Sequence, residues 1–463
     1  MDTAAIPHPP HRLPLLGDVV GMNPRAPVQS SLRLARDLGP ISVRRGLGME
    51  LVIVGGAELA AELNDDARFS KHVALHLPPL RRIVGDALFT AENDDPNWQL
   101  AHDILAPAFT REAMRGYHMI MLDVARELLA HWDAAAETGR RVDVTADTTR
   151  LTLETIGRAG FGYRFASFDR DRPHPFVTAM TRALRYANVS AVLPWAPALR
   201  VVGGSARRHR ADVAMMERIV DEVIAARRGG TAAEAPDLLG QMLATAHPET
   251  GRRLDPVNIR QQVITFMIAG HETTSGALSF ALYYLTRDPD AMARAQAEVD
   301  ALWGQADDAE PTFTDVPKLR YVRAALDEAL RLWPTAPGYL RAARTDTVLG
   351  GRYRMDQGDS ALVLLPLLHR DPQVWPDPDR FDPNRFAPGQ AKTRPPHAYK
   401  PFGTGQRACI GRQFALHEAV LAMGLVLHRY LLTPHDDYRL QIAESLTLKP
   451  RGFRLLLRRR HRP

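Results

Sequence analysis

The segment from Phe402 to Gly411 constrains this chain more than any other, because it holds Cys409, the only cysteine among 463 residues. A lone cysteine is usually an inert, buried apolar residue. Here Gly403 and Gly405 precede it and Gly411 follows it. Glycine lets a backbone turn tightly without strain, so amide N–H groups can point at the sulfur. The segment therefore predicts a built environment for the thiol.

A helix is predicted directly after the cysteine, since residues 413–423 have helical hydrophobic periodicity. A sulfur near a helix N-terminus is favoured as a thiolate. A thiolate in a glycine-lined turn, two residues from Arg407, suits an axial iron ligand, with the arginine available to an anionic porphyrin propionate. We therefore predict that Cys409 is a metal ligand and that Arg407 contacts the same cofactor.

This pattern resembles the haem-ligand loop of the cytochrome P450 family, Phe-x-x-Gly-x-Arg-x-Cys-x-Gly. The fixed positions of that loop are matched by Phe402, Gly405, Arg407, Cys409 and Gly411. The resemblance implies a mainly α fold with a small β portion, with haem b between a long oxygen-activating helix and the cysteine loop. It also implies haem contacts from Phe402, Gly403 and Gly411.

Length and composition are those of a globular protein with a sizeable core. Hydrophobic residues make up 45% and charged residues 24% of the chain. No linker-like break divides it, so we expect one domain over residues 1–463. The formal charge of +6 comes from scattered basic residues, which argues against nucleic acid and suits an acidic protein partner.

The first ten residues lack the basic and apolar regions of a signal peptide. No apolar run reaches the roughly 18 residues that a membrane span needs. A single cysteine excludes an intrachain disulfide. We therefore expect a cytoplasmic monomer without a membrane span.

Helical patterns dominate the chain after a predicted hairpin of two strands at residues 41–45 and 50–54. Further short strands are expected around residues 347–349 and 361–364. Helices are predicted at residues 96–104, 111–135, 145–157, 173–186, 205–228, 236–247, from 289 onward and at 314–332. The longest starts at the N-cap Asp255 with Pro256 behind it and runs to about Thr286, on the order of 45 Å.

The long helix contains Ala269-Gly270-His271-Glu272-Thr273-Thr274. Alone, this would be an apolar helix with polar residues on one side. The pair His271-Glu272 also begins a zinc-protease motif, but that motif needs a histidine where Ser275 stands. Zinc is therefore not expected.

The same stretch resembles the oxygen-activation motif of the cytochrome P450 family, which is matched in full. Activation of dioxygen needs a positioned hydroxyl and an acid that is resupplied from water. The resemblance implies that Gly270 leaves space beside the iron, that Thr273 bonds the bound oxygen and that Glu272 supplies protons. It assigns Ala269 to the same catalytic stretch.

Glu328 and Arg331 stand three residues apart on a predicted helix, as ordinary surface ion pairs do. They also resemble the Glu-x-x-Arg motif of the family, with Arg385 as the third member. The role implied is structural, a buried carboxylate between two arginines that locks the cysteine loop.

Trp98 and His102 lie one turn apart on the predicted helix at 96–104. They resemble the Trp-x-x-x-Arg pair that holds a haem propionate, with histidine in place of the commoner arginine. Histidine can be neutral, which leaves the charge of this contact open. Core packing is the alternative for His102.

Across nearly the whole chain the amino-acid sequence most resembles the haem domain of bacterial fatty-acid hydroxylases that are fused to a diflavin reductase. Two departures stand out. The chain shows no flavin- or nicotinamide-binding tract before its end at Pro463. The Arg and Tyr that hold the fatty-acid carboxylate in those relatives are matched by Met49 and Ile53.

The resemblance places Phe89, Ala269, Ala336 and Leu446 over the haem. The apolar stretch at residues 189–199 is either an entrance to the substrate cavity or a buried loop.

The sequence thus predicts a haem-thiolate monooxygenase that inserts one oxygen atom from dioxygen into an apolar lipid-like or secondary-metabolite substrate. Electrons would come from NAD(P)H through a ferredoxin, a flavodoxin or a diflavin reductase. The alternatives are a fatty-acid hydroxylase haem domain, a peroxide-driven peroxygenase, and a haem-binding sensor or electron carrier without turnover. A sensor would not need Thr273 and Glu272.

Overall fold

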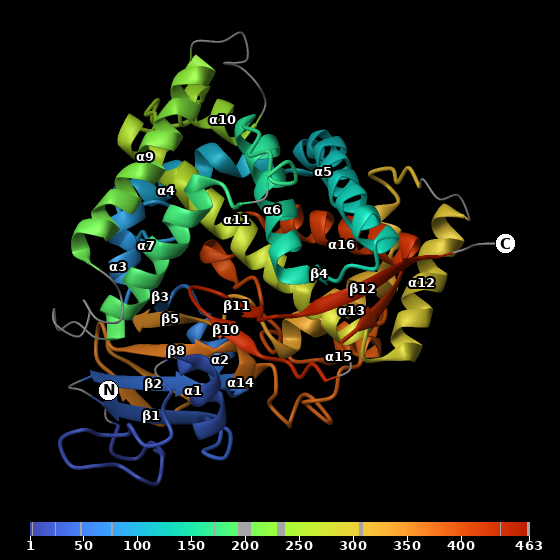
Figure 1. Ribbon diagram of the computed structural model, residues 1–463. Coiled ribbons are helices and arrows are strands. Elements are labelled where there is room, and N and C mark those ends of the chain that lie inside the picture. The colour runs from blue at the N-terminus through green and yellow to red at the C-terminus, as the bar shows by residue number, and fades with distance from the viewer. Residues whose placement is uncertain are drawn as a thin grey trace. The chain divides into compact units, whose positions relative to one another are not determined.

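The computed structural model describes residues 1, 3–23, 25–46, 49–75, 77–170, 172–192, 205–228, 237–304, 309–435 and 437–460. The chain divides into two compact units. Unit 1 comprises Met1–Ala74, Ala324–Cys409 and Ile442–Leu448, and unit 2 comprises Leu75–Arg323, Ile410–Gln441 and Lys449–Pro463. Helices make up most of the regular structure (Figure 1), so the predicted mainly α fold with a small β portion is confirmed. The single domain stays a prediction.

Unit 1 is built on a five-stranded sheet in the order β1-β2-β8-β5-β3, which Figure 1 shows edge to edge. Its strands are β1 (Ile41–Gly46), β2 (Met49–Val54), β8 (Ser360–Leu364), β5 (Gly338–Ala343) and β3 (Phe69–Lys71). Strand β2 runs parallel to β8, and the other neighbours are antiparallel. The predicted hairpin is confirmed, with Ile41 opposite Val54.

The core of unit 1 forms where β-branched and aliphatic side chains of this sheet meet short helices. Ile41, Val43, Val52 and Val54 are buried in one cluster, which also contains Leu63. The other elements of the unit are α1 (Pro27–Ala35), α2 (Ala57–Leu63), β6 (Thr347–Leu349), β7 (Tyr353–Met355), α14 (Leu365–Leu368), the 3-10 turns η3 (Pro383–Phe386) and η4 (Gly405–Arg407), α15 (Gln390–Thr393) and β10 (Ile442–Glu444).

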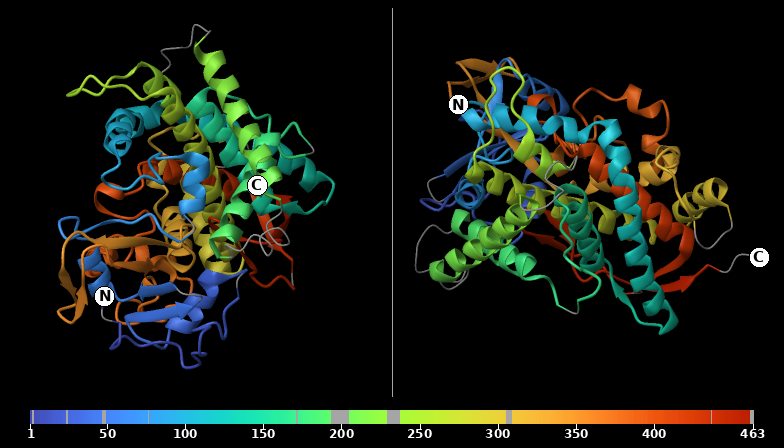
Figure 2. Two further views of the ribbon diagram at one scale, coloured as in Figure 1. Left: turned by 90° about the vertical axis from the view of Figure 1, so that its left-hand side faces the viewer. Right: turned by 90° about the horizontal axis from the view of Figure 1, so that it is seen from above.

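Unit 2 contains the long helices (Figures 1 and 2). They are α3 (Leu77–Val84), α4 (Pro96–Leu105), α5 (Arg111–Glu137), α6 (Val144–Phe161), α7 (Pro175–Val192), α9 (Ala206–Arg228), α10 (Leu238–Ala244), α11 (Pro256–Leu285), α12 (Pro289–Trp303) and α16 (Arg412–Arg429), with the 3-10 turns η1 (Ala106–Phe109) and η2 (Val316–Lys318). A three-stranded sheet has the order β4-β12-β9, with β4 (Val142–Asp143), β12 (Arg454–Arg459) and β9 (Tyr430–Pro434). Helix α13 (Arg320–Leu332) and strand β11 (Leu448–Pro450) each continue from one unit into the other.

Helix α11 matches its prediction closely because its start is encoded locally. The Asp255 carboxylate accepts hydrogen bonds from the amides of Val257 and Asn258, both at 2.9 Å, and Pro256 takes the first helical position. Helix α6 packs along α11, and a side chain at Gly270 would press on Ile156 at 3.2 Å. Gly270 is therefore explained by close helix packing as well as by the predicted space beside the iron.

Two helix predictions and the predicted apolar connection at residues 189–199 need correction. The helix predicted from residue 314 starts at Arg320, because Asp315 accepts a bond from the Thr312 amide at 2.9 Å and a 3-10 turn intervenes. The helix predicted at 236–247 is shorter, since Asp237 caps it and Thr245 is extended. The apolar stretch 189–199 includes the last turn of α7, and residues 193–199 lie outside the described part.

No helix in the described ranges is both long and apolar enough to cross a membrane.

Candidate active site

The loop before Cys409 is closed by its own backbone. The Cys409 amide donates to the Phe402 carbonyl at 2.8 Å, and the Gly403 amide donates to the Lys400 carbonyl at 3.0 Å. Gly403 and Gly405 have φ of 67° and 63°, a region that side chains rarely adopt. The predicted need for glycine is therefore real at both positions.

Asp66 anchors this loop, a role that was not predicted from the sequence. Its carboxylate accepts a hydrogen bond from the Gln406 amide at 3.1 Å and another from Arg341 at 2.6 Å. Arg341 in turn donates to the carbonyls of Leu63 and Phe69 at 2.7 and 3.0 Å. A buried guanidinium thus fixes the carboxylate on which the loop rests.

Glu328 lies between two arginines inside unit 1. Arg331 donates to both oxygens of its carboxylate, at 2.7 and 2.8 Å, and Arg385 lies 3.5 Å away. The Asp382 amide adds a bond at 2.9 Å. Arg331 also reaches the carbonyls of residues 369, 378 and 380. The geometry is that of a buried ionic lock, and its role in presenting Cys409 stays a prediction.

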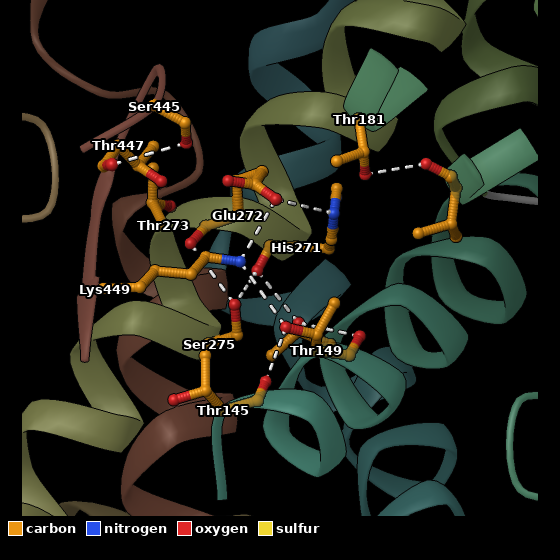
Figure 3. Close-up of polar contacts among 12 residues, drawn as sticks. Thr145, Thr149, Thr181, His271, Glu272, Thr273, Ser275, Ser445, Thr447 and Lys449 are labelled. Atoms are coloured by element: carbon orange, nitrogen blue, oxygen red, sulfur yellow. Dashed lines mark hydrogen bonds and ion pairs between the residues drawn. The ribbon is translucent and has the colours of Figure 1, made fainter. Parts of the chain in front are cut away.

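The motif on α11 lies in unit 2. The Thr273 hydroxyl donates to the Ala269 carbonyl at 2.9 Å, one turn back in the same helix. Glu272 lies beside Lys449, with 3.1 Å between Oε1 and Nζ, and 3.3 Å from Nε2 of His271 (Figure 3). Lys449 was missed, because nothing local in the sequence links it to Glu272.

The Glu272 carboxylate is held in its charged form. Burial by itself would raise the pKa of Glu272, but the charge of Lys449 and the hydrogen bond from His271 outweigh burial. The pKa of Glu272 therefore lies well below its usual range. At neutral pH this side chain is therefore an ionised carboxylate, and its predicted role in proton supply stays a prediction.

Comparison with known proteins decides the family. The family model for cytochrome P450 matches residues 7–457. The chain belongs to the cytochrome P450 family. The expected haem-thiolate oxidoreductase class is confirmed, and haem b is the cofactor of this family.

The curated P450 relatives are longer than this chain. A bifunctional cytochrome P450/NADPH–P450 reductase from Bacillus cereus is 45% identical, over 98% of this chain and 42% of its own length. A protein of the same description from Bacillus subtilis is 44% identical, over 99% of the chain and 43% of its own length. A self-sufficient cytochrome P450 monooxygenase from Phanerodontia chrysosporium is 40% identical, over 97% and 42%. The chain thus spans about two fifths of the relatives that it matches.

The cysteine loop fits a P450 haem. Cys409 is exposed, whereas free cysteines are among the most buried residues in proteins. No atom is closer than 3.7 Å to where a Cβ would stand on Gly403 or Gly411, apart from their chain neighbours. Helix α16 begins three residues after the cysteine in the sequence, as predicted. The residues present therefore suit a planar group that approaches the sulfur.

Trp98 and His102, the predicted propionate pair, stack with ring centroids 5.4 Å apart on α4. Nδ1 of His102 lies 3.2 Å from the Asp103 carboxylate, which also lies 3.1 Å from Nε2 of His247. Burial opposes the charged form of Asp103, but bonds from Gln99 and the two histidines outweigh burial and lower its pKa. The ionised Asp103 carboxylate thus lies beside His102, and the propionate contact of the pair stays a prediction.

Each of the predicted pocket residues has some solvent-exposed apolar surface. Phe89 is 39% exposed, Ala336 is exposed, and Ala269 and Leu446 are half-buried. The segment that carries Phe89 is tied to α11, since the Leu88 amide donates to the Gln262 side chain at 3.2 Å. Phe89 and Ala269 belong to unit 2, and Ala336 and Leu446 belong to unit 1.

Proposed function

We propose that this P450 chain inserts one oxygen atom from dioxygen into an apolar organic substrate. The reaction consumes the substrate, dioxygen, two electrons and two protons, and it yields the oxygenated product and water. Haem b, when bound, supplies the activation of dioxygen. The observation that carries the proposal is the occurrence of the glycine-turned Cys409 loop and the Glu272–Thr273 pair in one chain of this family.

Each named residue has a defined task in this proposal. Cys409 would hold the iron through its thiolate, and Arg407, Trp98 and His102 would hold the propionates. Thr273 would offer a hydroxyl to the reacting oxygen after releasing the Ala269 carbonyl, and Glu272 would pass protons toward it. These roles are the ones that the motifs of the family imply for the matching residues.

The electron donor is proposed to be a diflavin reductase that oxidises NAD(P)H. The Bacillus relatives carry NADPH–P450 reductase in their names. Ferredoxin and flavodoxin remain alternative donors.

The substrate is proposed to lack a free carboxylate. In unit 1, Ile53 is fully buried, and Met49 is 54% exposed at the end of the hairpin. The two nearby arginines already have partners. Arg44 donates to Ser31 at 2.9 Å, and Arg45 pairs with Glu50 and donates to Thr3. Neither arginine replaces the carboxylate-binding residues of the fatty-acid hydroxylases.

We further propose a cytoplasmic location, which a chain with one reactive thiol and no possible intrachain disulfide suits. An apolar, neutral substrate is also compatible with a role in secondary metabolism.

The test uses Cys409→Ser beside the matched control Ala408→Ser. The wild-type protein and the control should show the red-shifted Soret band of the reduced carbon monoxide complex, and Cys409→Ser should lose it. With a diflavin reductase, NADPH and ¹⁸O₂, the wild-type product should gain one labelled atom. A product whose new oxygen atom carries no label, or an unchanged Soret band in Cys409→Ser, contradicts the proposal.

A further inference from the structure

His271 is a buried histidine for which the motif names no task. It is fully buried on α11. Its Nδ1 lies 2.5 Å from the carbonyl oxygen of Met267, one turn back, and its Nε2 lies 3.3 Å from the Glu272 carboxylate (Figure 3). Both ring nitrogens thus face acceptor oxygens. A neutral imidazole has one N–H, so it can satisfy only one of them.

The Met267 carbonyl holds no proton, so Nδ1 must donate to it. The contact between Nε2 and the carboxylate is then favourable only with one further proton, on His271 or on Glu272. Among the described residues, Nε2 has no well-aligned hydrogen-bond partner. A buried polar atom left in this way is costly, and a small rotation of the carboxylate toward the ring would satisfy it.

Lys449 approaches the same carboxylate oxygen, Oε1, that His271 approaches. Its Nζ lies 3.1 Å from Oε1 of Glu272 and 3.4 Å from the hydroxyl of Thr149 on α6. The side chains of Lys449 and Glu272 are 12% and 13% exposed, so water reaches this edge of the cluster. His271 itself is fully buried, and its backbone carbonyl accepts a hydrogen bond from the Thr152 hydroxyl of α6 at 3.0 Å.

We propose that His271 stores the proton that Glu272 relays, and that Lys449 positions the carboxylate for this exchange. This rests on the proposed monooxygenase function. The proton leaves Nε2 of His271 for Oε1 of Glu272, and the ring keeps its Nδ1–H bond to Met267. The carboxylic acid then passes the proton on, and the exposed edge readmits one from water.

The net charge of the cluster of His271, Glu272 and Lys449 changes only by the one proton that it stores and delivers. Imidazolium, carboxylate and ammonium together carry one positive charge while the proton is stored, wherever it lies between His271 and Glu272. After delivery the remaining carboxylate and the Lys449 ammonium neutralise each other. The Lys449 ammonium stabilises the carboxylate form of Glu272 and therefore favours release of the stored proton. From α6 the contacts to the cluster come from the hydroxyls of Thr149 and Thr152.

The first test needs no turnover. Nitrogen-15 NMR of histidine-labelled protein in the diamagnetic reduced carbon monoxide complex reports the ring protonation, with the His271 signal assigned by its loss in His271→Gln. Between neutral and mildly acid pH, both ring nitrogens should carry protons. In Glu272→Gln the Nε2 proton should be lost. A His271 that stays neutral throughout this range overturns the proposal.

The second test measures the fraction of NAD(P)H electrons that reach product. His271→Gln should lower this coupling roughly tenfold, increase hydrogen peroxide and flatten its pH dependence. His271→Gln/Glu272→Gln should be no worse than Glu272→Gln. Lys449→Met should lower coupling, Lys449→Arg should restore much of it, and the surface control Lys318→Met should match wild type. Unchanged coupling in His271→Gln contradicts the inference, whereas absent product in wild type contradicts the proposed function and leaves the NMR test decisive.

Discussion

Arg331 donates hydrogen bonds to both oxygens of the Glu328 carboxylate, from Nε at 2.7 Å and from Nη2 at 2.8 Å. Neither side chain has any exposed surface. Such a pair is expensive to break, because removal of one partner leaves a buried charge without compensation. Arg385 lies 3.5 Å from the same carboxylate. If the carboxylate lost its charge, the guanidinium groups of Arg331 and Arg385 would be left close together without a negative charge between them.

Glu328→Gln is therefore expected to destabilise the protein by about 3–5 kcal/mol and to lower the fraction that retains haem. Urea unfolding and the ratio of haem to protein measure the two effects. The control is Arg354→Gln, which breaks the exposed Arg354–Asp356 pair and should cost less than about 1 kcal/mol. Equal stability of Glu328→Gln and wild type would show that the lock contributes nothing.

Gly405 should not tolerate a side chain. A Cβ there would stand 2.1 Å from the Asp66 carboxylate that anchors the cysteine loop, at a backbone φ of 63°. Gly405→Ala should displace Asp66 and lower haem retention, at a cost of roughly 2–4 kcal/mol. Gly358→Ala is the control, because Gly358 has φ of 88° with no atom within 4 Å of a Cβ. It should show only the backbone cost, about 1–2 kcal/mol. Equal effects of the two variants would show that the contact with Asp66 adds nothing to the cost of Gly405→Ala.

The features that were predicted correctly from the sequence are those that residues close together in the chain determine. Helix α11 followed from Asp255 and Pro256, whose capping and helix-starting properties act within one turn. The cysteine loop followed from glycines that are needed for its own backbone. Short strands such as β5 have no comparable local signal, because pairing with distant strands stabilises them.

The contacts that complete the candidate site were not predictable, because they join distant parts of the chain. Lys449 is 177 residues from Glu272, and Arg341 is 275 residues from Asp66. An unpaired lysine or aspartate in a sequence does not indicate which charge it will meet. Only the fold supplies that information.

Thr273 is predicted to control how electrons are used. Thr273→Ala removes the hydroxyl that bonds the Ala269 carbonyl at 2.9 Å, and alanine favours helix, so folding and haem binding should persist. Coupling of NAD(P)H oxidation to product should fall by roughly tenfold or more while hydrogen peroxide rises. Thr273→Ser keeps a hydroxyl and should retain most of the coupling. Wild-type coupling in Thr273→Ala would remove this hydroxyl from the mechanism.

Glu418 on α16 should make stability depend on pH. It is buried, its Oε1 has no hydrogen-bond partner among the described residues, and burial raises its pKa to about 8 from 4.5. The folded protein keeps this proton up to about pH 8, while the unfolded chain releases it near its ordinary value. The stability due to the protonated group is complete below that ordinary value and is lost as pH rises through the folded pKa.

Glu418→Gln keeps the shape without the titration. Relative to wild type, it should gain stability as pH rises, by up to roughly 4 kcal/mol on the alkaline side. Urea midpoints of the haem-bound protein from acid to alkaline pH measure the difference. Glu310→Gln, whose carboxylate is 81% exposed, is the control and should follow wild type. A Glu418→Gln profile parallel to that of wild type would mean that Glu418 is ionised in the fold.

The last prediction concerns the polar end of the substrate. Ile53 is buried in the sheet core of unit 1 beside Leu364 and Leu367, so it presents no hydrogen-bonding group. Arg44 and Arg45 are occupied by Ser31 and Glu50. A carboxylate that lost its water without a partner would pay a large desolvation penalty. A neutral methyl ester or alcohol should therefore bind more tightly than the free acid of the same chain length.

Dissociation constants from substrate-induced spectral shifts decide the matter. Met49→Arg places a guanidinium at the exposed end of the hairpin and should strengthen binding of the free acid roughly tenfold, about 1.4 kcal/mol, while leaving the ester unchanged. Met119→Arg adds the same charge at another exposed methionine, in unit 2, and should alter neither ligand. If the wild-type protein binds the acid tenfold more tightly than the ester, another residue anchors the carboxylate and the substrate is a free fatty acid.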